Sequence, residues 1–539
     1  MYAIKEQVFI KISRRSKNMF KKKSFNSVRA LMTVLLALAM LLPLVWTPVP
    51  AQAATPDGVY SFGGNRDGQL GHGARYGTYN SPVRIEGLEN VKSVVVGDSH
   101  SLALLHNGDV YSFGSNRGPA NVFGMLGHGD QEDRYAPTKI EGIGKVKAIG
   151  TGRSNSFLVL ENGDLYSFGH NGHGQLGHGD TENKLVPTKV EGISNAVAVD
   201  GGQSHTLVLL ENGDLYSFGY SSSGQLGEGD GGGLNHRTPL HVASLSKAKA
   251  IAAGITHSLV LLENGDVYSV GSNRNGELGY ETSGSYSNTP AKIPGLAPAK
   301  AVAAGSGFSL VLLENGDLYT FGYNRYSQLG QGDTEDRDRP TKVEALSGVS
   351  LINSGYRHSL AVLENGDVYS FGQGSGGKLG HGDTSDKSTP TRIEGLGGNN
   401  GLSIAAGFSH SLVLVGTPPI TIEIDGQRLH TEVPPIILQG RTMVPLRAIF
   451  EALDTDVEYD AETRQITGTR GATRIELTVD STQATVNGEG VILDAPATVM
   501  EGRTLVPVRF IAESTGQEVD WEPRTRTVLI TTIEPGDIF

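Results

Sequence analysis

A glycine-rich stretch is the first candidate for chemistry in this chain of 539 residues. The segment GHGQLG, at positions 172–177, has the G-x-G-x-x-G spacing that cradles the pyrophosphate of a dinucleotide in some enzymes. Such a loop follows a strand, opens a helix and belongs to a βαβ unit. The residues after Gly177 instead indicate a turn and another strand, and a related segment has Ser222 in place of Gly172. We therefore predict no dinucleotide site and no other cofactor.

Histidines recur in two patterns that would suit a metal site if they converged. They stand in LGHG and at the start of HSL or HTL: His72, His128, His178 and His381, then His100, His205, His257, His358 and His410. One histidine per repeat puts equivalent side chains in different units. Glu228 and Gln331 replace the first kind, and Asn155 and Phe308 replace the second. We expect each histidine to hydrogen-bond nearby backbone and predict no metal site.

Paired carboxylates and nucleophiles are the remaining catalytic candidates. Glu132, Asp133, Glu335 and Asp336 follow a Gly-Asp pair, but related loops carry acids at the same place, so they do not break the repeat as a hydrolase pair would. The chain has no cysteine, and we find no Ser-His-Asp elbow. We predict no catalytic residue and expect that the protein is not an enzyme.

The elements that would position these residues are repeats. Seven copies of a segment such as VYSFG or LYSFG have tyrosines spaced by 50–55 residues: Tyr60, Tyr111, Tyr166, Tyr216, Tyr268, Tyr319 and Tyr369. A second signal, such as SHSLALL from Ser99 or SHTLVLL from Ser204, has the same period. Regular repeats of this length indicate a propeller or a solenoid. Their Val, Leu, Tyr and Phe content with Gly punctuation predicts strands.

Each repeat is predicted to form one blade. ENGD between the two signals predicts a two-residue Asn-Gly turn with positive φ at both residues, and hence a tight hairpin. Segments such as PTKV and AVAAG supply two further strands. The first repeat signal, at position 58, lacks its hairpin partner, and HSLVLV ends the repeats at Val415 without a following YSFG. We predict a mainly β fold, a seven-bladed β-propeller closed by pairing of its two ends.

The motifs GDLYSFGxNxxGQLGHGD and AAGxxHSLVL resemble the repeats of the regulator of chromosome condensation family, over residues 57–416. The resemblance implies a propeller, here residues 54–416, and a partner bound through one face. Nuclear members act on a small GTPase, which we do not expect for an exported chain. The tryptophans of the plant ultraviolet-B receptor have no counterpart, because Trp46 and Trp521 lie outside the repeats.

Residues 1–53 are predicted to be a secretory signal. A basic segment precedes the apolar run from Ala30 to Val45, and AQA ends at Ala53 before the expected cut; Met19 would begin a conventional leader. This segment holds nine of the 45 basic and one of the 57 acidic residues, which leaves the rest of the chain with a net charge of −20. We therefore expect no nucleic-acid partner and no membrane span after cleavage.

A second, shorter duplication follows a linker at residues 417–419. GRTMVPLRAIF starts at Gly440 and GRTLVPVRFIA at Gly502, each followed by strand patterns. Residues 420–533 resemble the amino-terminal domain of copper amine oxidases, common in exported Gram-positive proteins, and predict a small duplicated α+β domain acting as a stalk; residues 534–539 form a tail. His430 is its single histidine, so copper chemistry is not expected. Arg441, Arg447, Arg503 and Arg509 either bind wall polymers or pair with nearby acids.

Strand direction puts the Gly-x-x-His entry and the loop after YSFG on one face, where residues vary between repeats. Tyr and Arg are frequent interface anchors. The predicted binding face comprises Arg66, Arg117, Arg153, His170, Gln203, Tyr220, Arg274, Phe308, Tyr323, Arg325, Tyr326, Tyr356, Arg357 and Phe408. The opposite face carries the acidic ENGD turns, which we attribute to turn chemistry.

Together these features predict a secreted or cell-surface binding protein. Its propeller would recognise an extracellular protein or a cell-wall glycan, and the C-terminal module would be a spacer or a wall-associated stalk. Two alternatives stay open: an extracellular hydrolase acting on polysaccharide, and a purely structural surface protein.

Overall fold

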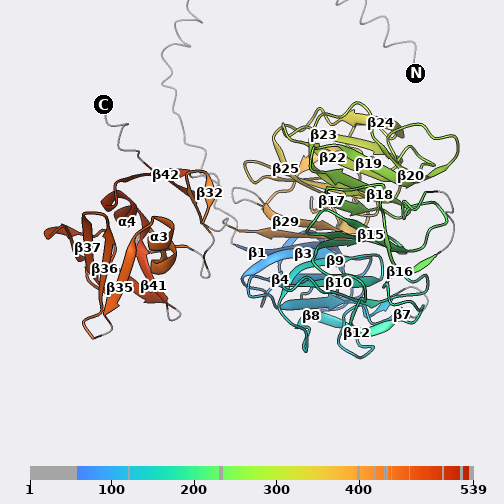
Figure 1. Cartoon of the computed structure of the whole chain (residues 1–539). Coiled ribbons are helices and arrows are strands. Elements are labelled where there is room, and N and C mark those ends of the chain that lie inside the picture. Colours follow the sequence, from blue (N-terminus) through green and yellow to red (C-terminus); the bar gives the residue numbers. More distant parts are fainter. Residues whose placement is uncertain are drawn as a thin grey trace, which may run out of the picture. The chain divides into compact units, whose positions relative to one another are not determined.

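The repeats form seven antiparallel sheets of four strands each, the blades of a propeller (Figure 1). The computed structural model describes residues 57–118, 122–229, 235–396, 401–416, 420–429, 431, 435–438, 440–460, 462–500, 503–522 and 526–532. The predicted signal, linker and tail lie outside these residues. In the described ranges no helix is long and apolar enough to cross a membrane.

Equivalent strands of the seven blades have closely similar bounds. The innermost strands are β3 (Val91–Val96), β9 (Val146–Thr151), β13 (Ala196–Gly201), β17 (Ala248–Ala253), β21 (Ala299–Ala304), β25 (Val349–Ser354) and β29 (Gly401–Ala406). The second strands are β4 (His100–Leu105), β10 (Asn155–Leu160), β14 (His205–Leu210), β18 (His257–Leu262), β22 (Phe308–Leu313), β26 (His358–Leu363) and β30 (His410–Val415).

The outer half of each blade has the same regularity. The third strands are β1 (Gly58–Gly64), β5 (Val110–Gly114), β11 (Leu165–Gly169), β15 (Leu215–Gly219), β19 (Val267–Ser272), β23 (Leu318–Gly322) and β27 (Val368–Gly372). The fourth strands are β2 (Thr78–Arg84), β8 (Arg134–Lys139), β12 (Lys184–Lys189), β16 (His236–His241), β20 (Tyr286–Lys292), β24 (Arg337–Lys342) and β28 (Lys387–Arg392). The loop after β5 adds a two-stranded ribbon, β6 (Arg117–Gly118) and β7 (Val122–Phe123), and the loop after β27 adds the 3₁₀ turn η2 (Ser375–Gly377).

The ENGD hairpins are confirmed, but the predicted turn type is wrong. Between β10 and β11, Gly163 N–H donates to the Leu160 carbonyl and Leu160 N–H to the Asp164 carbonyl, both at 2.9 Å. Gly163 has φ +82°, whereas Asn162 is not among the described residues with positive φ. This is a three-residue loop, a type I turn closed by a glycine bulge. Asn162 Oδ1 instead accepts the Asp164 N–H at 3.0 Å.

The two ends of the repeat region complete one blade, as predicted. Strand β1 pairs antiparallel with β30, from Gly58 opposite Val415 to Gly63 opposite His410. The resulting sheet has the order β2-β1-β30-β29, so the first two strands of the region and the last two share a blade. This pairing closes the ring without a free edge between first and last repeats.

The core lies between neighbouring blades. The YSFG phenylalanines, for example Phe168 and Phe218, are fully buried. Phe218 packs against Gly177 of the preceding blade, where an added Cβ would lie 3.0 Å from the ring. Gly177 also has φ +80°. The recurrent G-x-L-G glycine therefore permits close blade packing, and GHGQLG leads to strand β12 rather than to a helix.

The C-terminal domain is a duplicated α+β unit, as predicted. The first half contains β34 (Arg441–Pro445), α3 (Leu446–Ala452), β35 (Asp456–Asp460) and β36 (Gln465–Arg470); the second contains β41 (Arg503–Pro507), α4 (Val508–Ser514), β42 (Gln517–Glu522) and β43 (Thr527–Thr532). Further strands are β31 (Thr421–Ile424), β32 (Gln427–Arg428), β33 (Ile436–Leu438), β37 (Thr473–Thr478), β38 (Gln483–Val486), β39 (Glu489–Ile492) and β40 (Thr498–Met500).

The two halves meet around a local two-fold axis. Strands β34 and β41 pair antiparallel with Val444 directly opposite Val506, its equivalent 62 residues later. Ile449, Phe450 and Leu453 of the first half enter the domain core. The sheets have the orders β33-β34-β41-β40, β32-β31-β43-β42 and β35-β36-β37-β38-β39.

Candidate functional site

Two sets of loops share one face of the propeller, as predicted. One set joins innermost to second strands, as residues 97–99 join β3 to β4; the other joins third to fourth strands, as residues 115–133 join β5 to β8. His100 lies opposite Gly114, and Gly114 lies opposite Arg134, so both loops leave the same end of the blade. We call this end of the propeller the loop face.

The entry loops surround the mouth of a central channel of about 400 Å³. One residue from each blade follows the recurrent glycine, and all of them except Gln203 line the channel: Asp98, Arg153, Gln203, Ile255, Ser306, Tyr356 and Phe408. The glycine itself has no room for a side chain. At Gly355 an added Cβ would lie 2.4 Å from the Gly407 carbonyl oxygen and 2.6 Å from His358. Each blade therefore offers the residue after this glycine as its variable position at the mouth.

An aromatic cluster spans three neighbouring blades of the loop face. We use this name for Tyr323, Tyr326, Tyr356, Arg357 and Phe408. Ring centroids are 6.1 Å apart for Tyr323 and Tyr326 and 4.6 Å apart for Tyr356 and Phe408. The Arg357 guanidinium lies 4.2 Å from the Tyr326 ring and 4.9 Å from the Tyr356 ring, a cation–π bridge between the two pairs. Phe408 is 41% exposed, which is high for a phenylalanine.

Buried polar side chains hold this cluster in place. Gln328 Oε1 accepts the Tyr326 N–H at 3.0 Å. Lys378 replaces this glutamine in the next blade; its Nζ donates to Gln373 Oε1 at 2.7 Å and approaches the Phe408 carbonyl at 3.4 Å. Burial lowers the pKa of Lys378 to about 8, and Arg357 adds to the effect. We did not single out Lys378 from the sequence; its signal is a lysine where most repeats have glutamine.

An ion pair and a second aromatic group continue the loop face. Arg153 Nε contacts Asp98 Oδ2 at 2.5 Å, and burial raises the pKa of Asp98 to about 6 despite this partner. His173 lies between His170 and Tyr220, with ring centroids 6.5 and 4.9 Å away. Burial lowers the pKa of His170, with a smaller contribution from His173. This second group extends the aromatic surface of the loop face.

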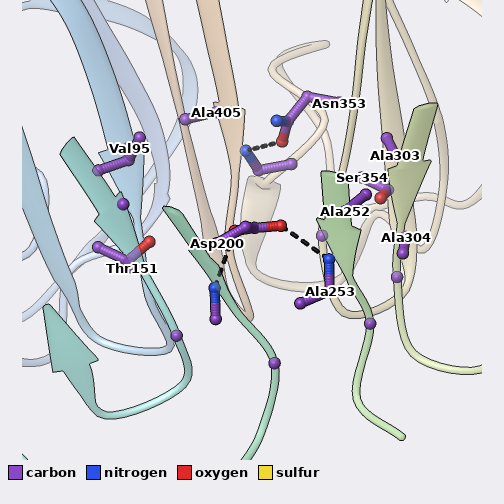
Figure 2. A pocket seen from close by; sticks show the side chains of 18 of the residues that line it. Val95, Thr151, Asp200, Ala252, Ala253, Ala303, Ala304, Asn353, Ser354 and Ala405 are labelled. Atoms are coloured by element: carbon purple, nitrogen blue, oxygen red, sulfur yellow. Dashed lines mark hydrogen bonds between the residues drawn. The ribbon is translucent and has the colours of Figure 1, made fainter. Parts of the chain in front are cut away.

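The channel wall is built of small residues with few polar groups. Figure 2 shows Asp200 and Asn353 among residues such as Ala252, Ala303 and Ala405. Asp200 accepts backbone N–H bonds from Ala253 at 2.8 Å and Gly201 at 3.1 Å, while Asn353 Oδ1 accepts one from Ala406 at 2.8 Å. Burial raises the pKa of Asp200 to about 7. Asp200 and Asn353 thus link neighbouring innermost strands.

Thirteen of the fourteen predicted face residues lie at the surface of the loop face. Arg66, Arg117, Arg274 and Arg325 are exposed at loop tips, and the others, apart from exposed Phe408, are half-buried. Phe308 is the exception: it is completely buried, so its prediction is wrong. It occupies the histidine position of its blade, where its ring packs over Gly305. Ser306 is the residue of that entry loop that reaches the mouth.

Several loop asparagines are structural. Asn324 donates to the Asp333 carbonyl at 3.2 Å and accepts the Leu329 N–H at 3.0 Å. Asn65 does the equivalent with Ala74 and Leu70. Such asparagines shape each loop from inside, which leaves the residues beside them to vary.

The HSL histidines link neighbouring blades rather than nearby backbone, which corrects the expected partner. Their Nε2 atoms lie 2.8–3.0 Å from a serine of the next blade: His100 to Ser156, His205 to Ser258, His257 to Ser309, His358 to Ser411 and His410 to Ser101. Each serine hydroxyl donates to a backbone carbonyl, for example Ser156 to Met125 at 2.8 Å, so Nε2–H is the donor. Within the described ranges no group of three or more His, Asp or Glu is placed to hold a metal ion.

The LGHG histidines act within a blade, since His178 Nε2 contacts Ser167 Oγ at 3.0 Å. The loop acids are engaged in structure too: Asp133 Oδ1 accepts the Asn116 N–H at 2.9 Å and Asp336 Oδ1 the Asn324 N–H at 2.7 Å. On the opposite face, turn aspartates pair with fourth-strand cations, as Asp164 does with Lys189 at 2.9 Å.

The fold and the loop face define a repeat-built seven-bladed propeller that displays variable residues on an invariant frame. Residues 51–296 and 192–418 match the model of the RCC1-like domain, and the chain belongs to this family, as its resemblance implied. Residues 423–530 match the model of the copper amine oxidase N-terminal domain.

The chain is similar to several known proteins over its repeats. It is 34% identical to the ultraviolet-B receptor UVR8 of Arabidopsis thaliana over 288 residues, 52% of this chain and 64% of that protein. It is 36% identical to the X-linked retinitis pigmentosa GTPase regulator of Canis lupus familiaris over 282 residues, 51% of this chain and 27% of that protein. The chain thus spans less than two thirds of either relative.

Solved propellers have the same fold. Prp20p of Saccharomyces cerevisiae is 25% identical with a TM-score of 0.59, covering 67% of this chain and 91% of that one. Human WBSCR16 is 22% identical with a TM-score of 0.60, covering 67% of this chain and 99% of that one. The second likeness concerns the fold alone.

Proposed function

We propose that this is a secreted or cell-surface binding protein whose loop face recognises a protein partner. The observation that carries the proposal is the aromatic cluster, in which three tyrosines, an arginine and an exposed phenylalanine from three blades form one continuous surface. Tyrosine and arginine supply large contact area together with hydrogen-bonding groups, the usual composition of an interface anchor.

Similar propellers support a protein partner over a glycan. The solved structure of yeast Prp20p is described with its binding to Gsp1p and histones, and another solved structure has Kap60 bound to the same yeast protein. Those partners belong to the yeast protein. For this chain they favour a face that binds protein, with a partner of its own.

Charge on the loop face indicates the chemistry of that partner. The entry loops and the first five residues after each third strand contain six arginines: Arg66, Arg117, Arg153, Arg274, Arg325 and Arg357. The same loop residues contain three acids, namely Asp67, Asp98 and the buried Glu277. This excess of cations is confined to these first loop residues, because later residues of the same loops are acidic, for example Glu132, Glu182 and Glu335. A partner with acidic side chains around an apolar centre fits such a surface, and its association should weaken with salt.

Export is the second part of the proposal and rests on the sequence of residues 1–53. In this view the C-terminal module is the spacer or wall-associated stalk, and no small GTPase is the partner. The hydrolase alternative gains no support from Asp133 and Asp336, because backbone N–H groups occupy their carboxylates.

Affinity capture from culture and cell-wall fractions tests the binding face. The variant carrying Tyr323→Ala, Arg325→Ala, Tyr326→Ala and Tyr356→Ala should lose partner capture at least about 100-fold, because anchors of this kind dominate interfaces. The matched control replaces the exposed Glu161, Glu211, Glu263 and Glu314 of the opposite turns by alanine. If both variants capture the partner equally well and their melting temperatures are unchanged, the loop face is not the binding surface.

A further inference from the structure

The C-terminal domain contains a cleft that the propeller's function does not use. Its volume is about 530 Å³, within the range of small-ligand sites. The side chains that matter are Ile437 on β33, Arg441 and Thr442 on β34, Arg509 on α4, and Trp521 on β42. Both halves of the duplication thus contribute to one cleft (Figure 1 shows β42, α4 and β41).

Trp521 is an unusual residue for a surface cleft. It is 36% exposed, although tryptophan is among the most buried side chains on average. Val519 lies two residues before Trp521 on the same side of β42, and it packs against the domain core. The indole N–H makes no hydrogen bond with the described residues. Together with Ile437, 48% exposed, the ring gives the cleft an apolar wall open to solvent.

The polar groups around this wall are balanced in charge. Arg441 is held against Asp494 at 2.7 Å, and Arg509 lies 3.7 Å from Glu513. Arg441 and Arg509 thus pair with acids, one of the two alternatives for these arginines, and the pairs leave guanidinium N–H donors at the cleft surface. Asp520 is exposed, but it lies opposite the exposed Leu529 and alternates with Trp521 along β42, so its side chain is on the other side of the strand. The cleft therefore presents donors and acceptors side by side without a net charge.

We infer that this cleft binds the pyranose rings of an uncharged glycan strand. An aromatic ring stacks on the apolar C–H face of a pyranose. The surrounding hydroxyls both donate and accept hydrogen bonds, which the arginines, Thr442 and Asp494 can match. A polyanion would meet Asp494 and Glu513, and a polycation would meet Arg441 and Arg509. This inference deepens the proposed wall association of the module and does not depend on the propeller's partner.

The first half of the duplication supplies a control residue. Tyr459 stands at the position equivalent to Trp521, 62 residues earlier, and is 47% exposed. It does not line this cleft. The two aromatic residues therefore have similar strand positions and exposure, but only Trp521 faces the residues named above.

Tryptophan fluorescence tests the inference directly in the full chain. Trp46→Phe makes Trp521 the only tryptophan, because the chain has two. Chito-, cello- and maltohexaose are added as uncharged glycans, and polyglutamate and polylysine as charged polymers. We expect a saturable change in Trp521 emission with at least one hexaose. Titration calorimetry of that hexaose, with Trp46 retained, should show a loss of affinity of at least about tenfold for Trp521→Ala and a change within about twofold for Tyr459→Ala.

Three results would overturn the inference: no saturable change with any hexaose, a response to a charged polymer alone, or equal losses for Trp521→Ala and Tyr459→Ala. Unchanged melting curves would show that both variants are folded. The propeller variants described above should not alter hexaose binding, so failure of this inference is separable from failure of the proposed loop-face function.

Discussion

At the scale of single residues, burial determines the chemistry of the histidines. Burial lowers the pKa of His100 and His257 to about 4 and of His205 and His410 to about 3, and that of His358 falls well below its usual value. Each ring is thus neutral and donates its Nε2–H to a serine of the next blade. The five rings have one structural role, repeated around the propeller.

These histidines predict acid sensitivity. In the unfolded chain these histidines bind a proton near pH 6.5, whereas in the folded protein they bind one only near pH 4. Their contribution to the free energy of unfolding is therefore complete above pH 6.5 and is lost as the pH falls toward 4. Each histidine contributes a loss of about 1.4 kcal/mol per pH unit in this window. Asp98 and Asp200, with raised pKa values, act in the opposite direction, but they are two groups against five. Melting temperature should therefore fall steadily from pH 7 to pH 5.

The control for this pH dependence is His205→Phe, since Phe308 fills the equivalent position in its own blade. The melting temperature of this variant should fall less steeply as the pH is lowered, because one of the five histidines no longer contributes. An identical slope would assign the acid sensitivity to other groups.

A second residue-scale prediction concerns Asp200. Its pKa of about 7 means that ionisation opposes folding at higher pH, whereas Asn353 makes the equivalent bond uncharged. Asp200→Asn should raise the free energy of unfolding by about 1–3 kcal/mol at pH 8, and the gain should shrink as pH falls below 7. Denaturant titrations at pH 8 and pH 5.5 measure the difference. Destabilisation at pH 8 would show that the negative charge itself is required.

At the scale of elements, two glycines with the same backbone conformation allow a matched comparison, one in a hairpin turn and one in the connection between two blades. Gly163 and Gly192 both have φ +82°. An added Cβ at Gly163 would lie 2.5 Å from Asn195 Cα of the next blade, whereas nothing lies within 4 Å at Gly192. Gly192→Ala should cost about 1 kcal/mol, the penalty for a side chain in this conformation. Gly163→Ala should cost at least about 3 kcal/mol, because backbone must move. Equal costs in chemical denaturation would contradict the packing described between these blades.

The same elements show what the sequence could and could not predict. The repeat length, the strand pattern and the incomplete first and last repeats were enough to predict the seven blades. They also predicted closure of the propeller by pairing of β1 with β30. The turn type failed because Asn-Gly suits both a two-residue turn and the observed glycine-bulge loop, which differ in the φ of Asn162. The prediction of Phe308 as a face residue was wrong because Phe308 follows Gly307 as a loop residue would, but belongs to strand β22, at the position of the HSL histidine. The contacts of Arg357 with two tyrosines depend on blade-to-blade geometry, which no linear pattern contains.

At the scale of the whole molecule, the proposal of export has a direct consequence. If residues 1–53 are a cleaved leader, the protein recovered from culture medium or cell surface should begin at Ala54. N-terminal sequencing measures this. A chain that retains the apolar run from Ala30 to Val45 would contradict cleavage and point to an anchored form.

The central claim is that the loop face, and not the opposite face, holds the partner. Photocrosslinking in the producing cells measures this most directly, with p-benzoylphenylalanine placed at Tyr326 on the loop face or at the exposed Glu364 on the opposite turns. The account predicts one discrete crosslinked protein from position 326, none from position 364, and loss of that product when Arg357→Ala is added. The same product from both positions, or from position 364 alone, would contradict it.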